Sequence, residues 1–145
     1  MGTTPTSRAR FITPVRVRPA DVDTSGTVYH GTYLAYFEVA RVEALRGLGV
    51  PVGEFERRGV LMPVVETRLT CLRRATVDDL LQVAVMLDRR GPASFSFDYE
   101  VACDDLVIAT GWTRMAVMSR DTGRPMPLPA WVRGLLGGIA GRTAS

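Results

Sequence analysis

The sequence contains no lysine and no asparagine, so all 18 of its basic residues are arginine. This bias is typical of a chain encoded by GC-rich codons, and it also supplies planar guanidinium groups that suit phosphate oxygens. The net charge is only +3, and the arginines are spread along the chain rather than clustered. The composition therefore does not predict a nucleic-acid-binding surface.

Cysteine and histidine are scarce, and long apolar runs are missing. Cys71 and Cys103 form no Cys-x-x-Cys pair, and His30 is the single histidine, so we expect neither a Cys/His metal centre nor a disulfide framework. The short apolar runs predict no membrane span. The opening residues, MGTTPTSRARF, lack the apolar segment of a secretory signal. We therefore expect a cytoplasmic protein with reduced thiols.

The composition is typical of a globular protein, with 46% hydrophobic and 23% charged residues. A chain of 145 residues fits one domain, and no repeat, low-complexity tract or linker divides it. We expect a single domain over residues 1–145 with an ordered core from about 10 to 136. Residues 1–9 are expected to form an arm and residues 137–145 a tail.

One long amphipathic helix is predicted near the N-terminus. Apolar residues from Tyr33 to Leu48 recur at spacings of three and four, which predicts a helix over about residues 30–48. Gly47 and Gly49, followed by Pro51, would end it. Its apolar stripe comprises Tyr33, Phe37, Ala40, Ala44 and Leu48.

The other apolar segments are rich in β-branched and aromatic residues and are separated by turn residues, which indicates strands. They cover residues 11–18, 62–73, 80–89, 93–103 and 106–118, and a short helix is predicted over 130–136. Consecutive strands joined by short turns pair antiparallel. The single long helix can bury its stripe only against that sheet. The order β-α-β-β-β-β therefore predicts an α+β protein of hot-dog architecture, a five-stranded antiparallel sheet wrapped around one central helix.

The segment before the helix, RPADVDTSGTVYHGTYLAYFEVAR, contains two aspartates, Asp21 and Asp23. The pattern D-x-D-x-S-G resembles the start of an EF-hand calcium loop, but the twelfth position is Thr32 instead of glutamate, which excludes that reading. A purely structural turn accounts for Gly26 and Asp21. It does not account for Asp23, which leaves a catalytic interpretation open.

The expected helix start offers a place for that chemistry. The sequence VYHGTYL contains no good side-chain cap, so backbone N–H groups would be free at the positive end of the helix dipole. Free N–H groups near His30 suit a carbonyl oxygen that gains negative charge, and Gly31 would allow a ligand to approach closely. A carboxylate such as Asp23 can attack that carbonyl or deprotonate a water that does.

The pattern D-V-D-T-S-G-T-V-Y-H-x-x-Y-L-x-Y-F-E-x-A-R resembles the signature of the 4-hydroxybenzoyl-CoA thioesterase family, which are acyl-CoA thioesterases of hot-dog fold. The segments LMPVVETRLTCLRRATVDDLLQV and TGRPMPLP also resemble parts of that family, so the similarity spans roughly residues 11–133. One departure is the TSG that follows Asp23, where relatives often carry Ala-Gly or Gly-Gly.

The resemblance implies a role for each residue of the motif. Asp23 matches the catalytic carboxylate, and His30 matches the position whose backbone N–H polarises the thioester carbonyl. Tyr29 and Tyr33 match positions that line the acyl pocket. It further implies an acyl-CoA substrate, no cofactor or metal, and a site shared across a homodimer, often within a homotetramer.

Two arginines are candidates for binding coenzyme A. Arg89 and Arg90 flank the turn DRRGP, and guanidinium groups on exposed loops suit the phosphates of coenzyme A. Two alternatives stay open at this point: a non-catalytic module that binds acyl-CoA or an acyl carrier protein, and a thioesterase acting on carrier-bound chains. A hot-dog hydratase is disfavoured, because hydratases place aspartate and histidine five residues apart, whereas Asp23 and His30 are seven apart.

Overall fold

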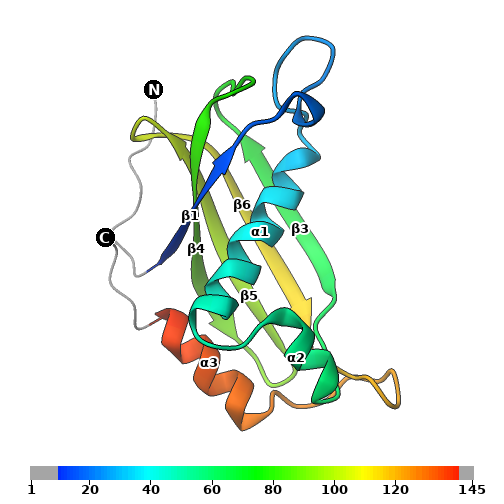
Figure 1. Cartoon of the computed structure of the whole chain (residues 1–145). Coiled ribbons are helices and arrows are strands. Elements are labelled where there is room, and N and C mark those ends of the chain that lie inside the picture. The colour runs from blue at the N-terminus through cyan, green and yellow to red at the C-terminus, as the bar shows by residue number, and fades with distance from the viewer. Residues whose placement is uncertain (1–9, 141–145) are drawn as a thin grey trace.

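The computed structural model of the chain describes residues 10–140. Five strands form the main sheet, two very short strands form a separate pair, and one long and two short α-helices accompany them (Figure 1). In chain order the elements are β1 (Phe11–Arg16), the 3-10 turn η1 (Pro19–Asp21), α1 (Thr32–Gly47), α2 (Val52–Arg57), β2 (Val60–Leu61), β3 (Val64–Cys71), β4 (Leu80–Arg90), β5 (Ser94–Cys103), β6 (Leu106–Ala116), β7 (Met118–Ser119) and α3 (Ala130–Ala140).

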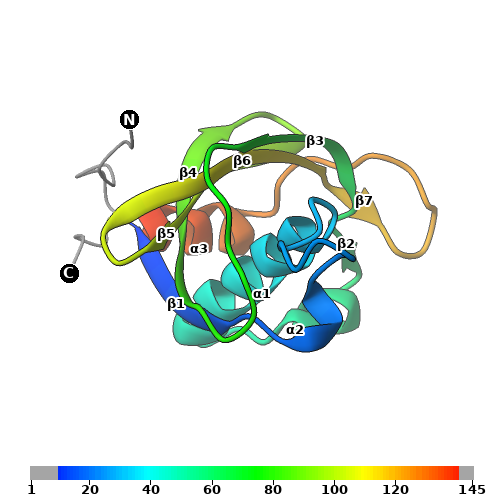
Figure 2. The same cartoon turned by 90° about the horizontal axis from the view of Figure 1, so that it is seen from above.

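The main sheet has the strand order β1-β4-β5-β6-β3, and every neighbouring pair is antiparallel. Seen from above, it curves around α1, which lies in its hollow (Figure 2). This arrangement confirms the hot-dog architecture predicted from the sequence. The β1–α1 connection lies at one end of the sheet, and α2 and α3 lie at the other (Figure 1).

The predicted apolar stripe packs α1 against the sheet. Phe37 is fully buried and stacks on Tyr99 of β5, with ring centroids 4.4 Å apart. Gly111 of β6 lies beneath the same ring, because a Cβ added there would be 2.3 Å from two ring atoms of Phe37. Burying a phenylalanine side chain contributes roughly 1.5–3 kcal/mol. The aromatic contact therefore fixes the helix on the sheet, and it requires glycine at position 111.

The element boundaries differ from the prediction at both ends of the chain. Helix α1 begins at Thr32 instead of His30, because residues 29–31 form a turn in which the Thr32 N–H donates to the Tyr29 carbonyl. Helix α3 continues to Ala140, so the prediction that a tail starts at residue 137 was wrong. Gly138 fits there because its missing side chain leaves room for Leu48. The predicted arm, residues 1–9, and the last five residues of the predicted tail lie outside the described residues.

Strand β3 forms one edge of the sheet, and nearly all of its side chains are exposed. Leu69 is the half-buried exception, whereas Val64 and Val65 are exposed although they are apolar. An exposed edge strand presents unpaired backbone groups to any chain that can add a strand. Within residues 10–140, no helix has both the length and the hydrophobicity to cross a bilayer.

Candidate active site

Asp21 anchors the connection between β1 and α1. Its side chain is buried, with 3% of the residue surface exposed. The carboxylate accepts hydrogen bonds from the Arg18 backbone N–H at 3.0 Å, from Arg18 Nη2 at 2.9 Å and from the Tyr36 hydroxyl at 2.9 Å. Burial alone would raise the pKa of Asp21, but the hydrogen bonds from Arg18 and Tyr36 outweigh it and hold the pKa below its ordinary value. Asp21 therefore ties the connection to α1.

Asp23 lies in a tight turn on the surface. Its Oδ1 accepts hydrogen bonds from the Ser25 hydroxyl at 2.6 Å, the Ser25 N–H at 2.9 Å and the Thr27 N–H at 3.3 Å. The Ser25 hydroxyl contributes most to holding the pKa of Asp23 below its ordinary value. The carboxylate is therefore ionised at neutral pH. All three hydrogen bonds reach Oδ1, and no donor to Oδ2 is found among residues 10–140.

The turn returns the chain to the start of α1. Val22 forms an antiparallel bridge with Val28, and the Asp23 N–H donates to the Thr27 carbonyl at 2.9 Å. Gly26 has a φ of +80°, a backbone conformation that favours glycine. Asp23 is thus held opposite Thr27, and Thr27 precedes His30 by three residues. The Asp23 carboxylate and the start of α1 therefore lie at the same end of the fold.

The turn that leads into α1 has two backbone N–H groups for which residues 10–140 provide no acceptor. The N–H groups of Tyr33 and Leu34 donate back to the carbonyls of His30 and Gly31, at 3.2 Å each. Across the described part of the chain, no acceptor is found for the His30 and Gly31 N–H groups, and no side chain caps the helix. These two donors lie at the positive end of the helix dipole. They are suited to bind an oxygen that develops negative charge.

The other motif residues lie in two different environments. Tyr29 is 51% exposed, and its ring packs on His30 with centroids 4.4 Å apart. The same ring fills the space beside Gly31, where a Cβ would be 2.7 Å from Tyr29 Cε2. Tyr33 is 2% exposed and packs edge-on against Tyr36, and burial raises its pKa to about 12. Within one chain, Tyr29 therefore borders the helix start, whereas Tyr33 belongs to the core.

Arg89 and Arg90 lie far from Asp23 within one chain. They are the last two residues of β4, an 11-residue strand that extends about 35 Å. The strand starts near the Asp23 turn and ends beside α3, where Arg90 Nη1 donates to the Arg133 carbonyl at 3.3 Å (Figure 1). Only a second copy of the chain could bring these arginines to the Asp23 end of the molecule.

A groove that sequence reasoning missed lies between α1 and β3. It consists of an open cavity of about 310 Å³ beside β3 and an adjoining, more enclosed one of about 150 Å³ between α1, α2, α3 and the sheet, and Glu38 and Arg41 line both. The open part begins at Leu34 in the first turn of α1, and the deeper part ends among apolar residues of α2, α3 and the sheet. Its helix wall comprises Leu34, Ala35, Glu38, Arg41, Val42 and Leu45. These α1 residues form a second, partly apolar stripe beside the stripe that faces the core. The sequence could have indicated the groove through this stripe.

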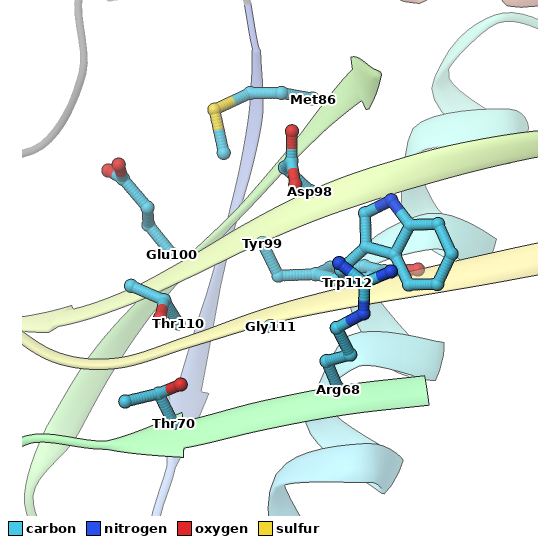
Figure 3. Close-up of a pocket in the computed structure, with 9 residues that line it drawn as sticks. All are labelled: Arg68, Thr70, Met86, Asp98, Tyr99, Glu100, Thr110, Gly111 and Trp112. Carbon is cyan, nitrogen blue, oxygen red and sulfur yellow. The ribbon is translucent and has the colours of Figure 1, made fainter. Parts of the chain in front are cut away.

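A separate cavity of about 370 Å³ lies on the opposite face of the sheet, away from α1 (Figure 3). The Arg68 guanidinium packs over the Trp112 ring at 4.2 Å from its centroid, and Asp98 and Glu100 line the same cavity. Asp88 accepts a hydrogen bond from Trp112 Nε1 at 2.9 Å. The strands separate this polar surface from the Asp23 end of α1, so we do not include it in the candidate site.

Comparison with known proteins identifies the family. Residues 17–136 match the sequence pattern of the thioesterase-like superfamily. An acyl-CoA thioesterase of Haemophilus influenzae, named YbgC, is 31% identical over 124 residues, which cover 85% of this chain and 91% of that protein. The chain belongs to the thioesterase-like superfamily. It is therefore a member of a family of thioester hydrolases.

Two further comparisons support this assignment to the thioesterase-like superfamily. A 1,4-dihydroxy-2-naphthoyl-CoA hydrolase of Thermosynechococcus vestitus is 29% identical over 132 residues, covering 83% of this chain and 90% of that protein. The crystal structure of a hypothetical protein of Thermus thermophilus superposes with a TM-score of 0.84 at 31% identity, covering 89% of this chain and 98% of the other. The match extends over nearly the whole hot-dog domain.

Proposed function

We propose that the protein hydrolyses an acyl-CoA thioester to the free acid and coenzyme A, as the motif shared with the 4-hydroxybenzoyl-CoA thioesterase family suggests. The observation that carries this proposal is the ionised Asp23 carboxylate held at the same end of the fold as two free N–H groups, those of His30 and Gly31. An activated carbonyl needs both a nucleophile or base and a donor for its oxygen.

In the proposed reaction the thioester carbonyl oxygen accepts hydrogen bonds from the His30 and Gly31 N–H groups. Asp23 Oδ2 then attacks the carbonyl carbon, or it removes a proton from a water that attacks. The tetrahedral intermediate collapses with loss of the coenzyme A thiolate, which takes up a proton. In the first route, water cleaves the acyl-aspartyl anhydride and regenerates the carboxylate. Each oxyanion donor is worth about 10²–10³ in rate in comparable sites.

A homodimer or homotetramer is part of the proposal. If two copies add their exposed β3 edges to each other in antiparallel fashion, the Asp23 end of one copy meets the opposite end of the other. That opposite end carries Arg89 and Arg90, which would then be placed for the phosphates of coenzyme A. The groove between α1 and β3 would become enclosed by the second copy.

The test is thiol release from a panel of acyl-CoA substrates, with light scattering to measure the oligomeric state. We expect turnover by the parent protein, and we expect His30→Ala to keep most of it because alanine retains the backbone N–H. A large loss in His30→Ala would assign the chemistry to the imidazole instead. Tight binding of acyl-CoA without any turnover would support a binding module and contradict the proposal.

A further inference from the structure

The middle of α1 carries a guanidinium group that is largely buried but weakly partnered. The Arg41 side chain is 15% exposed. Over the part of the chain that the structure describes, its polar side-chain neighbours are the Tyr99 hydroxyl, 3.5 Å from Nη1, and Glu38 Oε2, 4.0 Å from Nη2. Both distances are at the outer limit for a hydrogen bond or ion pair. The Arg41 guanidinium, which has five N–H donors, thus has most of its hydrogen-bonding capacity available to a ligand in the adjoining cavities.

The two neighbours of Arg41 are poorly suited to neutralise it. The Tyr99 hydroxyl is already hydrogen-bonded to the Thr113 hydroxyl at 2.7 Å, and burial raises the pKa of Tyr99, so this group stays uncharged. The Glu38 side chain is 67% exposed, so water screens its charge. With no counter-ion closer than Glu38 among residues 10–140, the Arg41 guanidinium is available to bind an anionic group of a ligand.

Arg41 lies where a ligand in the groove would meet it. It borders both the open cavity that starts at Leu34 and the deeper cavity that ends among apolar side chains. Gly31 and Arg41 are ten positions apart along α1, and a helix rises about 1.5 Å per residue, so their Cα atoms are roughly 15 Å apart. Helical side chains lean toward the N-terminus, which shortens the reach to about 10 Å.

We propose that Arg41 determines substrate specificity by binding a carboxylate at the far end of the acyl chain. The preferred substrate would then be the coenzyme A monothioester of a dicarboxylic acid of medium length. A carboxylate matches the fork of the guanidinium in geometry and neutralises its charge. This inference rests on the proposed function, because it places the thioester carbonyl at the His30 and Gly31 N–H groups and the acyl chain in the groove.

Hydrolysis of paired substrates tests the proposal. Adipoyl-, suberoyl- and sebacoyl-CoA carry a terminal carboxylate, whereas hexanoyl-, octanoyl- and decanoyl-CoA match them in length without it. We expect the parent protein to prefer the carboxylate member of the best-fitting pair by roughly 10–100-fold in kcat/KM, the range of a hydrogen bond to a charged group. Arg41→Leu should reduce this ratio to about one, Arg41→Lys should retain part of it, and Glu38→Gln should increase it.

The matched control is Arg46→Leu, which removes the same charge from the same helix. Arg46 is largely exposed, pairs with Glu43 and does not line the groove, so this variant should keep the preference of the parent. Equal treatment of both substrates of every pair by the parent would overturn the proposal. So would a preference that survives Arg41→Leu in a protein that melts at the parent temperature.

A binding measurement separates this inference from the proposed function. S-decyl-CoA and S-(9-carboxynonyl)-CoA are thioethers that cannot be hydrolysed, and titration calorimetry gives their affinities. Tighter binding of the carboxylated thioether by the parent, but not by Arg41→Leu, would support the carboxylate site even if no thioester were hydrolysed. Equal affinities of the parent for the two thioethers would overturn it.

Discussion

Asp21 and Asp23 carry the same carboxyl group two positions apart, but their surroundings differ. Asp21 is buried and uses both of its oxygens, with Arg18 and Tyr36 as donors. Asp23 is exposed, and its hydrogen bonds from Ser25 and Thr27 all reach one oxygen. Both pKa values lie below the ordinary value, so ionisation alone does not tell the two residues apart. The two residues differ because only Asp23 retains a carboxylate oxygen that accepts no hydrogen bond from residues 10–140 and can react.

The largest expected effect comes from Asp23→Asn. An amide cannot act as nucleophile or base, so kcat should fall by roughly 10²–10⁴, the usual contribution of a general base. The melting temperature should change little because the asparagine Oδ1 can accept the same hydrogen bonds from Ser25 and Thr27. Asp121→Asn, the same substitution on another exposed turn, is the control and should retain the parent kcat. A similar loss in both variants would remove Asp23 from the proposed mechanism.

Asp21→Asn should affect stability more than chemistry. The amide loses the charge-assisted hydrogen bonds to Arg18, so we expect a loss of about 1–3 kcal/mol in the free energy of unfolding, measured by urea titration. Turnover per folded molecule should fall much less than in Asp23→Asn. Equal losses of turnover in the two variants would contradict the roles assigned to them.

The pH dependence of stability gives Asp21→Asn a second readout. The pKa of Asp21 is lower in the folded state than in the unfolded state, where it is about 3.9. The stability that this carboxylate contributes is therefore present above the unfolded pKa and is lost as the pH falls through the folded pKa. Urea titrations of Asp21→Asn should consequently show a weaker decline in stability with acidification than those of the parent.

Tyr36→Phe should have a smaller effect on the same anchor. The variant removes one neutral donor to Asp21 and keeps the aromatic ring in the core, so we expect a loss of about 1 kcal/mol in thermal or urea unfolding. Because Tyr36 and Asp21 are partners, the double variant with Asp21→Ala, which leaves no side-chain acceptor, should lose less than the sum of the two single losses. Strict additivity would show that the hydrogen bond between them contributes nothing.

The smallest expected effect is a shift in the pH profile of Ser25→Ala. The Ser25 hydroxyl donates to the Asp23 carboxylate and lowers its pKa, so its removal should raise that pKa. The acid limb of kcat/KM should then move to higher pH, with nearly unchanged activity at neutral pH. Thr24→Ala, a neighbour on the same loop, provides the matched control. An unmoved acid limb would mean that the limb does not report Asp23.

The fold could be predicted because its signals are local. The stripe from Tyr33 to Ala44 needs only helical periodicity, and the later strands need only turn residues between β-branched segments. Helix α2 was missed because it has six residues and begins beside Pro51 with Gly53 inside it, so its sequence is typical of a loop.

The candidate site could be predicted only in part, because some of it depends on contacts between distant residues. The motif indicated Asp23 and the uncapped helix start directly. The hydrogen bond from Tyr36 to Asp21 and the placement of Arg41 beside Tyr99 join different elements, and no sequence spacing specifies them. The turn residues around Arg89 and Arg90 were recognised, but which end of the sheet they occupy depends on the pairing of β4 with β1.

The contact between Phe37 and Gly111 also fixes where α1 lies along the sheet. Phe37 stands between Gly31 and Arg41 on the same helix, and its ring occupies the space that a side chain on Gly111 would fill. The helix therefore cannot slide along the sheet without forcing this ring against the β6 backbone. The helical rise sets the span from the helix start to Arg41. The contact at Gly111 sets where that span lies on the sheet, so a methyl group added at position 111 would displace both ends of the span together.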